Sequence, residues 1–135
     1  MMKAFAAGLL GMMLCFVAPA PAGSQEPALS ENEVRELFAG NTEVGEGRKD
    51  DVDTGRRWTA FYDTDNSVRT REKESGVEGS GTWFVDKDGR HCFRWEGKEK
   101  TKCDVIVRDG DHYLRVREGQ VRGRIRIDEG NTSNL

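Results

Sequence analysis

Short apolar and β-branched stretches recur about every 8–12 residues along most of this chain, with turn-forming residues between them. This pattern is clearest from Arg57 to about residue 128. Strands joined by such short turns pair with their chain neighbours as antiparallel hairpins. Asp109-Gly110 is the strongest single signal, because Asp-Gly between two strands favours a tight hairpin turn. We predict strands near residues 41–45, 56–62, 67–74, 78–85, 90–96, 100–108, 111–117 and 121–128.

One short helix is predicted ahead of the strands. Ser30 and Glu33 have the spacing of a capping box, in which each side chain bonds the other residue's backbone amide. Leu29 and Val34 stand at the positions of a hydrophobic staple. A helix over residues 31–39 follows, and it is too short to be stable unless its apolar side docks on the strands.

These elements together predict an all-β fold. It is an antiparallel up-and-down meander of about eight strands, a closed or half-open barrel, with the helix covering an end or a face. Residues 45–55 are polar and interrupted by glycines, so we expect a mobile loop there. The single domain should cover residues 29–128, between a flexible lead-in at 23–28 and a disordered tail at 129–135.

Charge density limits the possible functions. Charged residues make up 33% of the 135 residues, against roughly 25% in an average globular protein. The 21 basic and 24 acidic residues nearly balance, at a net charge of −3. This length excludes a multi-domain enzyme, and this balance disfavours a nucleic-acid partner, which would require a basic surface.

The first 22 residues have the pattern of a secretory signal peptide. Lys3 precedes an apolar run over residues 4–17, which is too short to span a bilayer as a helix. Ala18-Pro19-Ala20-Pro21-Ala22 then supplies the small residues of a cleavage site, and we favour cleavage after Ala22. The chain is therefore expected to be periplasmic or secreted, with no transmembrane segment once the signal is removed. An uncleaved N-terminal anchor is the alternative.

Removal of this segment, which contains Cys15, leaves Cys92 and Cys103. An even pair in a small exported domain predicts a disulfide. Closing so short a loop would contribute about 3 kcal/mol of stability in the chain-entropy model. The two cysteines have no histidine at metal-ligand spacing, so neither a metal nor another cofactor is predicted.

Hairpin registers suggest an anion-binding face. Two-residue turns at Asp109-Gly110 and Gly119-Gln120 place aliphatic residues of the last three strands on one face, which we take as the core side. A turn at Gly97-Lys98 places Cys92 opposite Cys103 and directs Phe93 and Trp95 away from that aliphatic face, so either a bulge intervenes or these aromatics cover a second face under the helix. The turns at Asp109-Gly110 and Gly119-Gln120 also gather an aromatic residue and five guanidiniums on the outer face, where they could bind a phosphate, a carboxylate or an anionic partner. The residues of this predicted face are Tyr113, Arg115, Arg117, Arg122, Arg124 and Arg126.

Catalytic and calcium-binding motifs are weak. His91 and His112 lie inside predicted strands, with His112 expected on the core side, and no nucleophile motif is present. We therefore predict no catalytic residue. The acidic segments 63–67 and 86–89 begin like calcium loops, but the first has Val68 where such a loop requires glycine. Asp, Asn and Gly are also ordinary turn residues, so no metal site is assigned.

A dispersed set of residues resembles a family of small exported bacterial proteins of unknown function. The set is Leu29-Ser30, Glu33-Val34, Leu37-Phe38, Gly40-Asn41-Thr42, Trp58, Phe61-Tyr62, Gly81-Thr82-Trp83, Asp88-Gly89, Cys92, Trp95, Cys103, Asp109-Gly110 and Tyr113. The resemblance implies a periplasmic location and no assigned activity. Gly81-Thr82-Trp83 is also similar to the G-x-W motif of lipocalins and small barrel-type protease inhibitors. There the motif opens the first strand and here it lies mid-chain, so no functional residue is transferred.

The sequence thus predicts a non-catalytic exported protein that contacts an envelope protein or an anionic component through its surface. One alternative is a lipocalin-like carrier of a small apolar ligand, although an eight-stranded barrel is just wide enough for its own side chains to fill. A small hydrolase is a further alternative, and it would require a polar cleft that joins a histidine to carboxylates.

Overall fold

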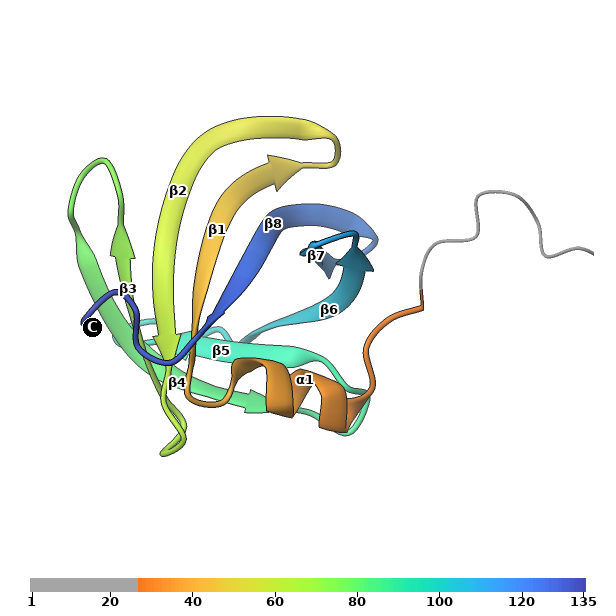
Figure 1. The fold of residues 1–135 in the computed structure, drawn as a ribbon, viewed down its shortest axis with the longest axis horizontal. Coiled ribbons are helices and arrows are strands. Elements are labelled where there is room, and N and C mark those ends of the chain that lie inside the picture. Colours follow the sequence, from red (N-terminus) through yellow and green to blue (C-terminus); the bar gives the residue numbers. More distant parts are fainter. Residues whose placement is uncertain (1–26) are drawn as a thin grey trace, which may run out of the picture.

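The computed structural model describes residues 27–135 and confirms the predicted all-β architecture. Eight antiparallel strands close into a barrel in chain order, β1 pairing with both β2 and β8. Helix α1 lies across one end of this barrel (Figure 1). The elements are α1 (Glu31–Phe38), β1 (Asn41–Lys49), β2 (Val52–Tyr62), β3 (Ser67–Glu72), β4 (Glu78–Val85), β5 (His91–Trp95), β6 (Lys102–Asp109), β7 (His112–Arg117) and β8 (Gln120–Glu129).

Local sequence signals account for α1. Ser30 is the N-cap, and both hydrogen bonds of the capping box with Glu33 are present. The helix turns Val34 and Phe38 toward the barrel, where both side chains are fully buried. The predicted docking of the helix is therefore confirmed, and its apolar side closes one end of the barrel.

The segment 45–55, predicted as a mobile loop, is instead the end of the β1–β2 hairpin, with its turn at Asp50 and Asp51. The glycines that suggested a loop leave space for side chains of the paired strand. A Cβ on Gly45 would stand 2.3 Å from the Trp58 indole, so only glycine lets this ring lie against β1. Opposite charges on the hairpin also pair, with Arg57 contacting Glu46 across the two strands and Asp53 along β2, so a polar composition is compatible with this regular structure.

The two ends of the predicted domain also differ from expectation. The predicted signal peptide, residues 1–22, lies outside the described residues, as do residues 23–26 of the predicted lead-in. Ala28, at the end of the lead-in, forms a β-bridge with Val107. Of residues 129–135, expected to be disordered, Glu129 ends β8 and the rest pass beside Thr42 of β1 toward β3. Thr42 Oγ1 donates to the Gly130 carbonyl at 2.6 Å and accepts from the Thr132 amide at 3.1 Å.

The disulfide is present as predicted. Cys92 and Cys103 pair directly across β5 and β6, with bonded sulfur atoms. In residues 27–135, no helix is long and apolar enough to cross a membrane.

The last hairpin corrects the sequence-based register. Tyr113, rather than Leu114, pairs with Ile125, because the β7–β8 turn falls one residue earlier than predicted and a bulge follows Arg115. A shift of one residue exchanges the two faces of a strand. The aliphatic side of β6 and β7, which carries Val105 and Leu114, consequently faces outward.

Candidate functional site

The inside of the barrel contains charged groups where an apolar core was expected. Glu43, Asp104 and Arg115 are all buried, with at most 4% of their surface exposed. They come from β1, β6 and β7 and meet in the middle of the barrel. We call these three residues together with Tyr62 and His91 the central network.

Arg115 is the hub of the central network. Its Nε donates to Glu43 Oε1 at 2.6 Å, and its Nη1 donates to Asp104 Oδ2 at 3.0 Å. Its Nη2 donates to the Tyr62 hydroxyl at 3.0 Å. Burial alone would lower the pKa of Arg115, but Glu43, Tyr62 and Asp104 together outweigh it and raise the pKa. The guanidinium is therefore a fixed positive charge whose donors are committed within the protein.

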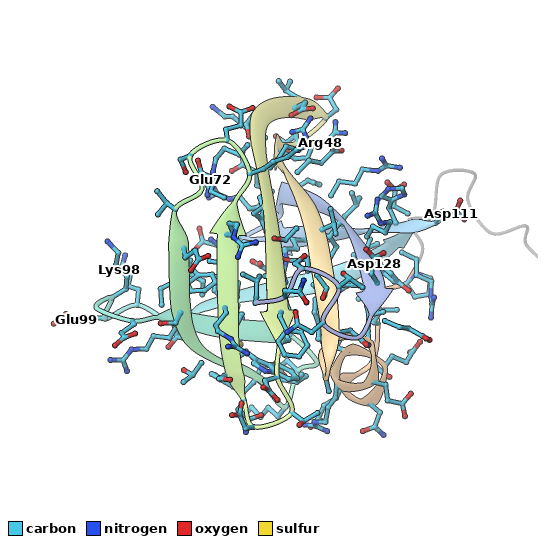
Figure 2. All side chains as sticks on the ribbon, turned by 60° about the vertical axis from the view of Figure 1, so that its left-hand side comes forward. Arg48, Glu72, Lys98, Glu99, Asp111 and Asp128 are labelled. Atoms are coloured by element: carbon cyan, nitrogen blue, oxygen red, sulfur yellow. A yellow bond between two sulfur atoms is a disulfide. The ribbon has the colours of Figure 1, made fainter. Side chains whose placement is uncertain are left out.

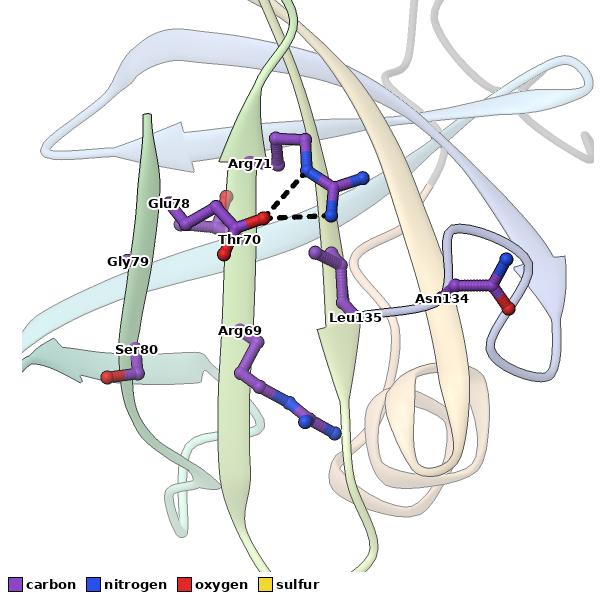
Figure 3. A pocket seen from close by; sticks show the side chains of 8 residues that line it. All are labelled: Arg69, Thr70, Arg71, Glu78, Gly79, Ser80, Asn134 and Leu135. Carbon is purple, nitrogen blue, oxygen red and sulfur yellow. Dashed lines mark hydrogen bonds and ion pairs between the residues drawn. The ribbon is translucent and has the colours of Figure 1, made fainter. Parts of the chain in front are cut away.

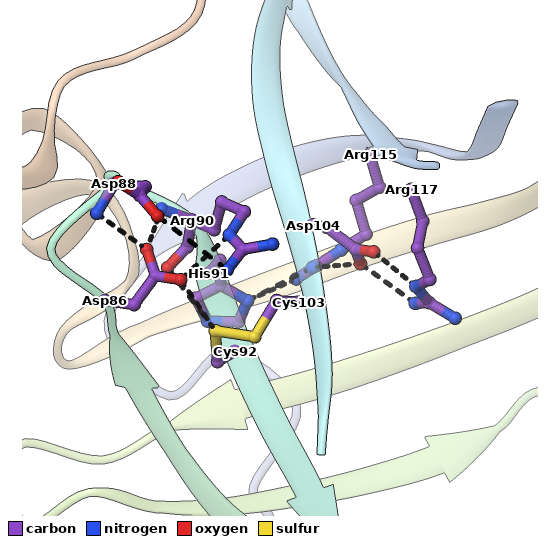
Figure 4. Close-up of a disulfide and its surroundings, with 9 residues drawn as sticks. All are labelled: Asp86, Asp88, Arg90, His91, Cys92, Cys103, Asp104, Arg115 and Arg117. Atoms are coloured by element: carbon purple, nitrogen blue, oxygen red, sulfur yellow. Dashed lines mark hydrogen bonds and ion pairs between the residues drawn. A yellow bond between two sulfur atoms is a disulfide. The ribbon is translucent and has the colours of Figure 1, made fainter. Parts of the chain in front are cut away.

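The two buried carboxylates have further donors. Glu43 Oε2 accepts from the Trp58 indole N–H at 2.7 Å and from the Tyr62 hydroxyl at 3.2 Å. Asp104 accepts two bonds from Arg117, the shorter being 2.7 Å from Nε to Oδ1 (Figure 4). Two carboxylates thus face two guanidiniums, which compensates the charge inside the barrel.

His91 completes the central network on the side toward α1. Its ring stacks on Phe38 with centroids 3.9 Å apart, and its Nδ1 lies 3.1 Å from Arg115 Nη1. Burial, together with the positive charge of Arg115, holds the pKa of His91 well below its ordinary value. The neutral ring accepts at Nδ1 and carries its proton on Nε2, which has no partner among the described residues.

Burial likewise raises the pKa of the Tyr62 hydroxyl well above its ordinary value, and the neighbouring Glu43 carboxylate adds to the increase. Tyr62 thus remains protonated and donates to Glu43. The central network thus joins the buried ion pairs of Arg115 with Glu43 and Asp104 to two neutral members, His91 and Tyr62.

A second group of cations gathers at the barrel end opposite α1. Arg56 in the middle of β2, Lys102 at the start of β6 and Arg117 at the end of β7 lie on the inner face. Arg56 lies over the Trp58 ring at 5.9 Å, and Arg117 lies over Phe93 at 5.7 Å. Trp95 stands 5.5 Å from Phe93, ring centroid to ring centroid. We call Arg56, Trp58, Phe93, Trp95, Lys102 and Arg117 the cation–aromatic end.

Electrostatics at this end favour an anion. Partial burial lowers the pKa of Lys102, and so do the charges of Arg117, Arg56 and Arg122, against which only Asp104 acts. Within residues 27–135, Arg56, Lys102 and Arg122 form no ion pair. Cations from three other strands therefore act on Lys102, and Asp104, which already pairs with Arg117, is the carboxylate that opposes them.

The six residues predicted to share an outer anion-binding face are divided between the two sides of the barrel wall. Tyr113, Arg115 and Arg117 face inward, because they lie on the inner side of β7. Arg124 and Arg126 remain outside on β8, where Arg124 pairs with Asp109 at 3.0 Å and Arg126 pairs with Asp128 at 3.0 Å. Arg122 is the exposed residue of the β7–β8 bulge, and its charge helps to lower the pKa of Lys102. The shared outer face is therefore wrong, and the reason is the one-residue register shift.

Sequence reasoning also missed Glu43, Asp104 and His91 as members of an inner site. The signal for part of it was present, because the correctly predicted Cys92–Cys103 pairing places His91 directly opposite Asp104. Phe93 and Trp95 point away from Val105 and Val107 and mark the inner face of β5, which decides between the two arrangements that the sequence left open. His112, expected on the core side, lies on the outer face of β7 beside Leu114 and is only half-buried.

The acidic turns are explained by local hydrogen bonds. Asp65 accepts from the Ser67 amide at 2.8 Å, which fixes the β2–β3 turn. Asp86 accepts from the Asp88 and Arg90 amides at 3.0 and 2.9 Å, which fixes the β4–β5 turn. Many other charged residues, such as Lys98, Glu99 and Asp111, project away from the barrel at its hairpin tips (Figure 2).

A shallow outer pocket of about 300 Å³ lies between β3, β4 and the C-terminal residues (Figure 3). Of its two cations, Arg71 already binds Glu78 through two donors, and only Arg69 has no ion pair among the described residues. This pocket therefore has less unpaired charge than the cation–aromatic end, which is the stronger candidate site.

No protein-family model matches this chain, and a search of curated proteins finds no match. The resemblance to a family of small exported proteins stays a prediction. The candidate site therefore rests on geometry and electrostatics.

Proposed function

We propose that this chain is an exported, non-catalytic binding protein that takes an anionic ligand bearing a ring at the cation–aromatic end of its barrel. One observation carries the proposal: Arg56, Lys102 and Arg117 converge beside exposed aromatic surface, and no described carboxylate pairs with the first two. Repulsion among like charges is relieved when an anion binds between them.

The residues at this end define the ligand chemistry. Arg117 uses Nε and Nη2 on Asp104, so its Nη1 remains available to donate to a phosphate or carboxylate oxygen. Trp58 and Trp95 are only half-buried and offer ring surface beside the cations. A ligand with one anionic group and one planar ring uses both features, whereas a purely apolar ligand would meet the ionic central network inside the barrel. The lipocalin-like alternative is therefore the less supported one.

The central network supports a non-catalytic role. Each carboxylate of Glu43 and Asp104 is buried and saturated by donors, and His91 is shut off from solvent. A general base must reach the proton that it abstracts. Their hydrogen bonds join β1, β5, β6 and β7 inside the barrel, and none of these groups is accessible to a substrate.

Export is supported by the N-terminal pattern and by the disulfide, since disulfides persist mainly in oxidising compartments. N-terminal sequencing of protein recovered from a periplasmic fraction should begin at Gly23. Recovery of the uncleaved chain from the cytoplasm would contradict the localisation.

Ligand binding is tested with three matched probes: phenyl phosphate, inorganic phosphate and phenol. Tryptophan fluorescence or calorimetry should give the highest affinity for phenyl phosphate, because it alone combines charge and ring. The double variant Arg56→Glu with Lys102→Glu should weaken phenyl phosphate binding at least tenfold. Both side chains are exposed, so this variant should fold.

Lys87→Glu is the matched control. Lys87 is exposed in the β4–β5 turn, at the end of the barrel where Gly89 contacts the start of α1. Its variant should bind phenyl phosphate within twofold of wild type. Equal losses in Lys87→Glu and in the double variant would show that only net charge matters, and equal affinity for all three probes would reject the combined site.

A further inference from the structure

A second set of possible ligand atoms lies on the outside of the barrel, around the disulfide (Figure 4). One oxygen of Asp86, Oδ2, lies 3.8 Å from Cys92 Sγ. The carboxylate and both sulfur atoms lie within 4.8 Å of one another. The set is separate from the cation–aromatic end, because Cys92 and Cys103 face away from the barrel interior.

The turn before β5 holds the Asp86 carboxylate in place. Asp86 Oδ1 accepts from the Asp88 and Arg90 amides, and Oδ2 accepts from Arg90 Nε at 2.8 Å. A carboxylate oxygen has more than one acceptor position, so Oδ2 can accept from Arg90 and still bind a metal ion. Donors that orient a ligand in this way are typical of the surroundings of protein metal sites.

We propose that Cys92, Cys103 and Asp86 form a zinc site when the disulfide is reduced. A dithiol reductant transfers two electrons and two protons to the disulfide, which leaves two protein thiols and one oxidised cyclic disulfide. Zn²⁺ then displaces the two thiol protons and binds both thiolates and Asp86 Oδ2, with water as the fourth ligand. Thiolate and carboxylate are both ordinary zinc ligands, and three protein ligands with one water is an established open geometry.

The disulfide and the zinc site exclude each other, because both use the same two sulfur atoms. Strands β5 and β6 are therefore cross-linked either by the disulfide or by the metal ion. His91 adjoins Cys92 in sequence but turns into the barrel toward Arg115, so it is not a ligand. Asp88 lies in the same turn as Asp86 and serves as the control for it, because 65% of its side chain is exposed. It should not contribute.

The test uses the full chain with Cys15→Ser in every sample, which leaves the two cysteines of interest. After reduction with a dithiol and its removal under anaerobic conditions, Co²⁺ serves as a spectroscopic substitute for Zn²⁺. We expect a thiolate-to-cobalt absorption band at one equivalent, displaced by Zn²⁺, and no band in the oxidised protein. Asp86→Asn should weaken Co²⁺ affinity at least tenfold, and Asp88→Asn should leave it within twofold.

Circular dichroism of each reduced sample establishes that the barrel persists. Absence of the band in folded reduced protein would overturn the proposal, and so would loss of the fold on reduction, because the site requires paired β5 and β6. Equal Co²⁺ affinity in Asp86→Asn and wild type would remove Asp86 from the site and equally overturn it.

Discussion

Removal of the buried positive charge at Arg115 should destabilise the barrel strongly. The side chain of Arg115 is 5% exposed and donates to Glu43, Asp104 and Tyr62. Arg115→Met keeps a similar length but leaves the Glu43 carboxylate buried without a counter-charge. Breaking a buried ion pair by removing one partner costs about 3–5 kcal/mol. Small domains are stable by only about 5–15 kcal/mol, so this loss is a large share of the total.

Urea unfolding followed by tryptophan fluorescence measures this change. Arg126→Met is the matched control, because Arg126 also pairs with an aspartate but is 53% exposed. Exposed pairs contribute about 0–1 kcal/mol, so the control should unfold close to wild type. An Arg115→Met variant within about 1 kcal/mol of wild type would refute the central network as a structural frame.

Three further predictions follow. The pKa of His91 is held low in the folded protein, so below about pH 6.5 the unfolded chain binds a proton that the native state does not. The free energy of unfolding should therefore fall by up to about 1.4 kcal/mol per pH unit as the pH decreases. In urea unfolding at pH 5–7, His91→Gln should show a shallower dependence of this free energy on pH, and an unchanged dependence would assign the acid sensitivity to another group. Gly45→Ala should cost about 1–3 kcal/mol, since its Cβ would stand 2.3 Å from the Trp58 indole, and a wild-type melting temperature would contradict that contact. Ser30→Ala should cost about 1 kcal/mol through loss of the helix cap, whereas Ser30→Asp should retain most of the stability in the same thermal assay.

Features set by neighbouring residues could be predicted from the sequence. The helix cap depends on four consecutive residues, and the strands depend on local apolar runs and turns. The opposition of Cys92 and Cys103 follows from one short hairpin. These interactions are local, so the sequence specifies them without knowledge of the rest of the barrel.

The contents of the barrel interior could not be predicted in the same way. Arg115 and Glu43 are 72 residues apart and meet only because β1 and β7 curve around the same closed sheet. Val105 and Leu114 resemble core residues, yet they lie outside, because a half-buried outer wall also accommodates aliphatic side chains. The β7–β8 turn has positive φ at Glu118 and Gly119, and this choice of turn residues moved the register by one position.

The cation–aromatic end is tested most directly by following the three indole N–H signals by nuclear magnetic resonance during a phenyl phosphate titration. Trp58 and Trp95 lie at that end, whereas Trp83 is buried beside His91 and donates to the Asp63 carbonyl at 2.9 Å. The proposal predicts saturable shifts of the Trp58 and Trp95 signals and a stationary Trp83 signal. Stationary signals from Trp58 and Trp95, or a larger shift at Trp83, would contradict binding at this end of the barrel.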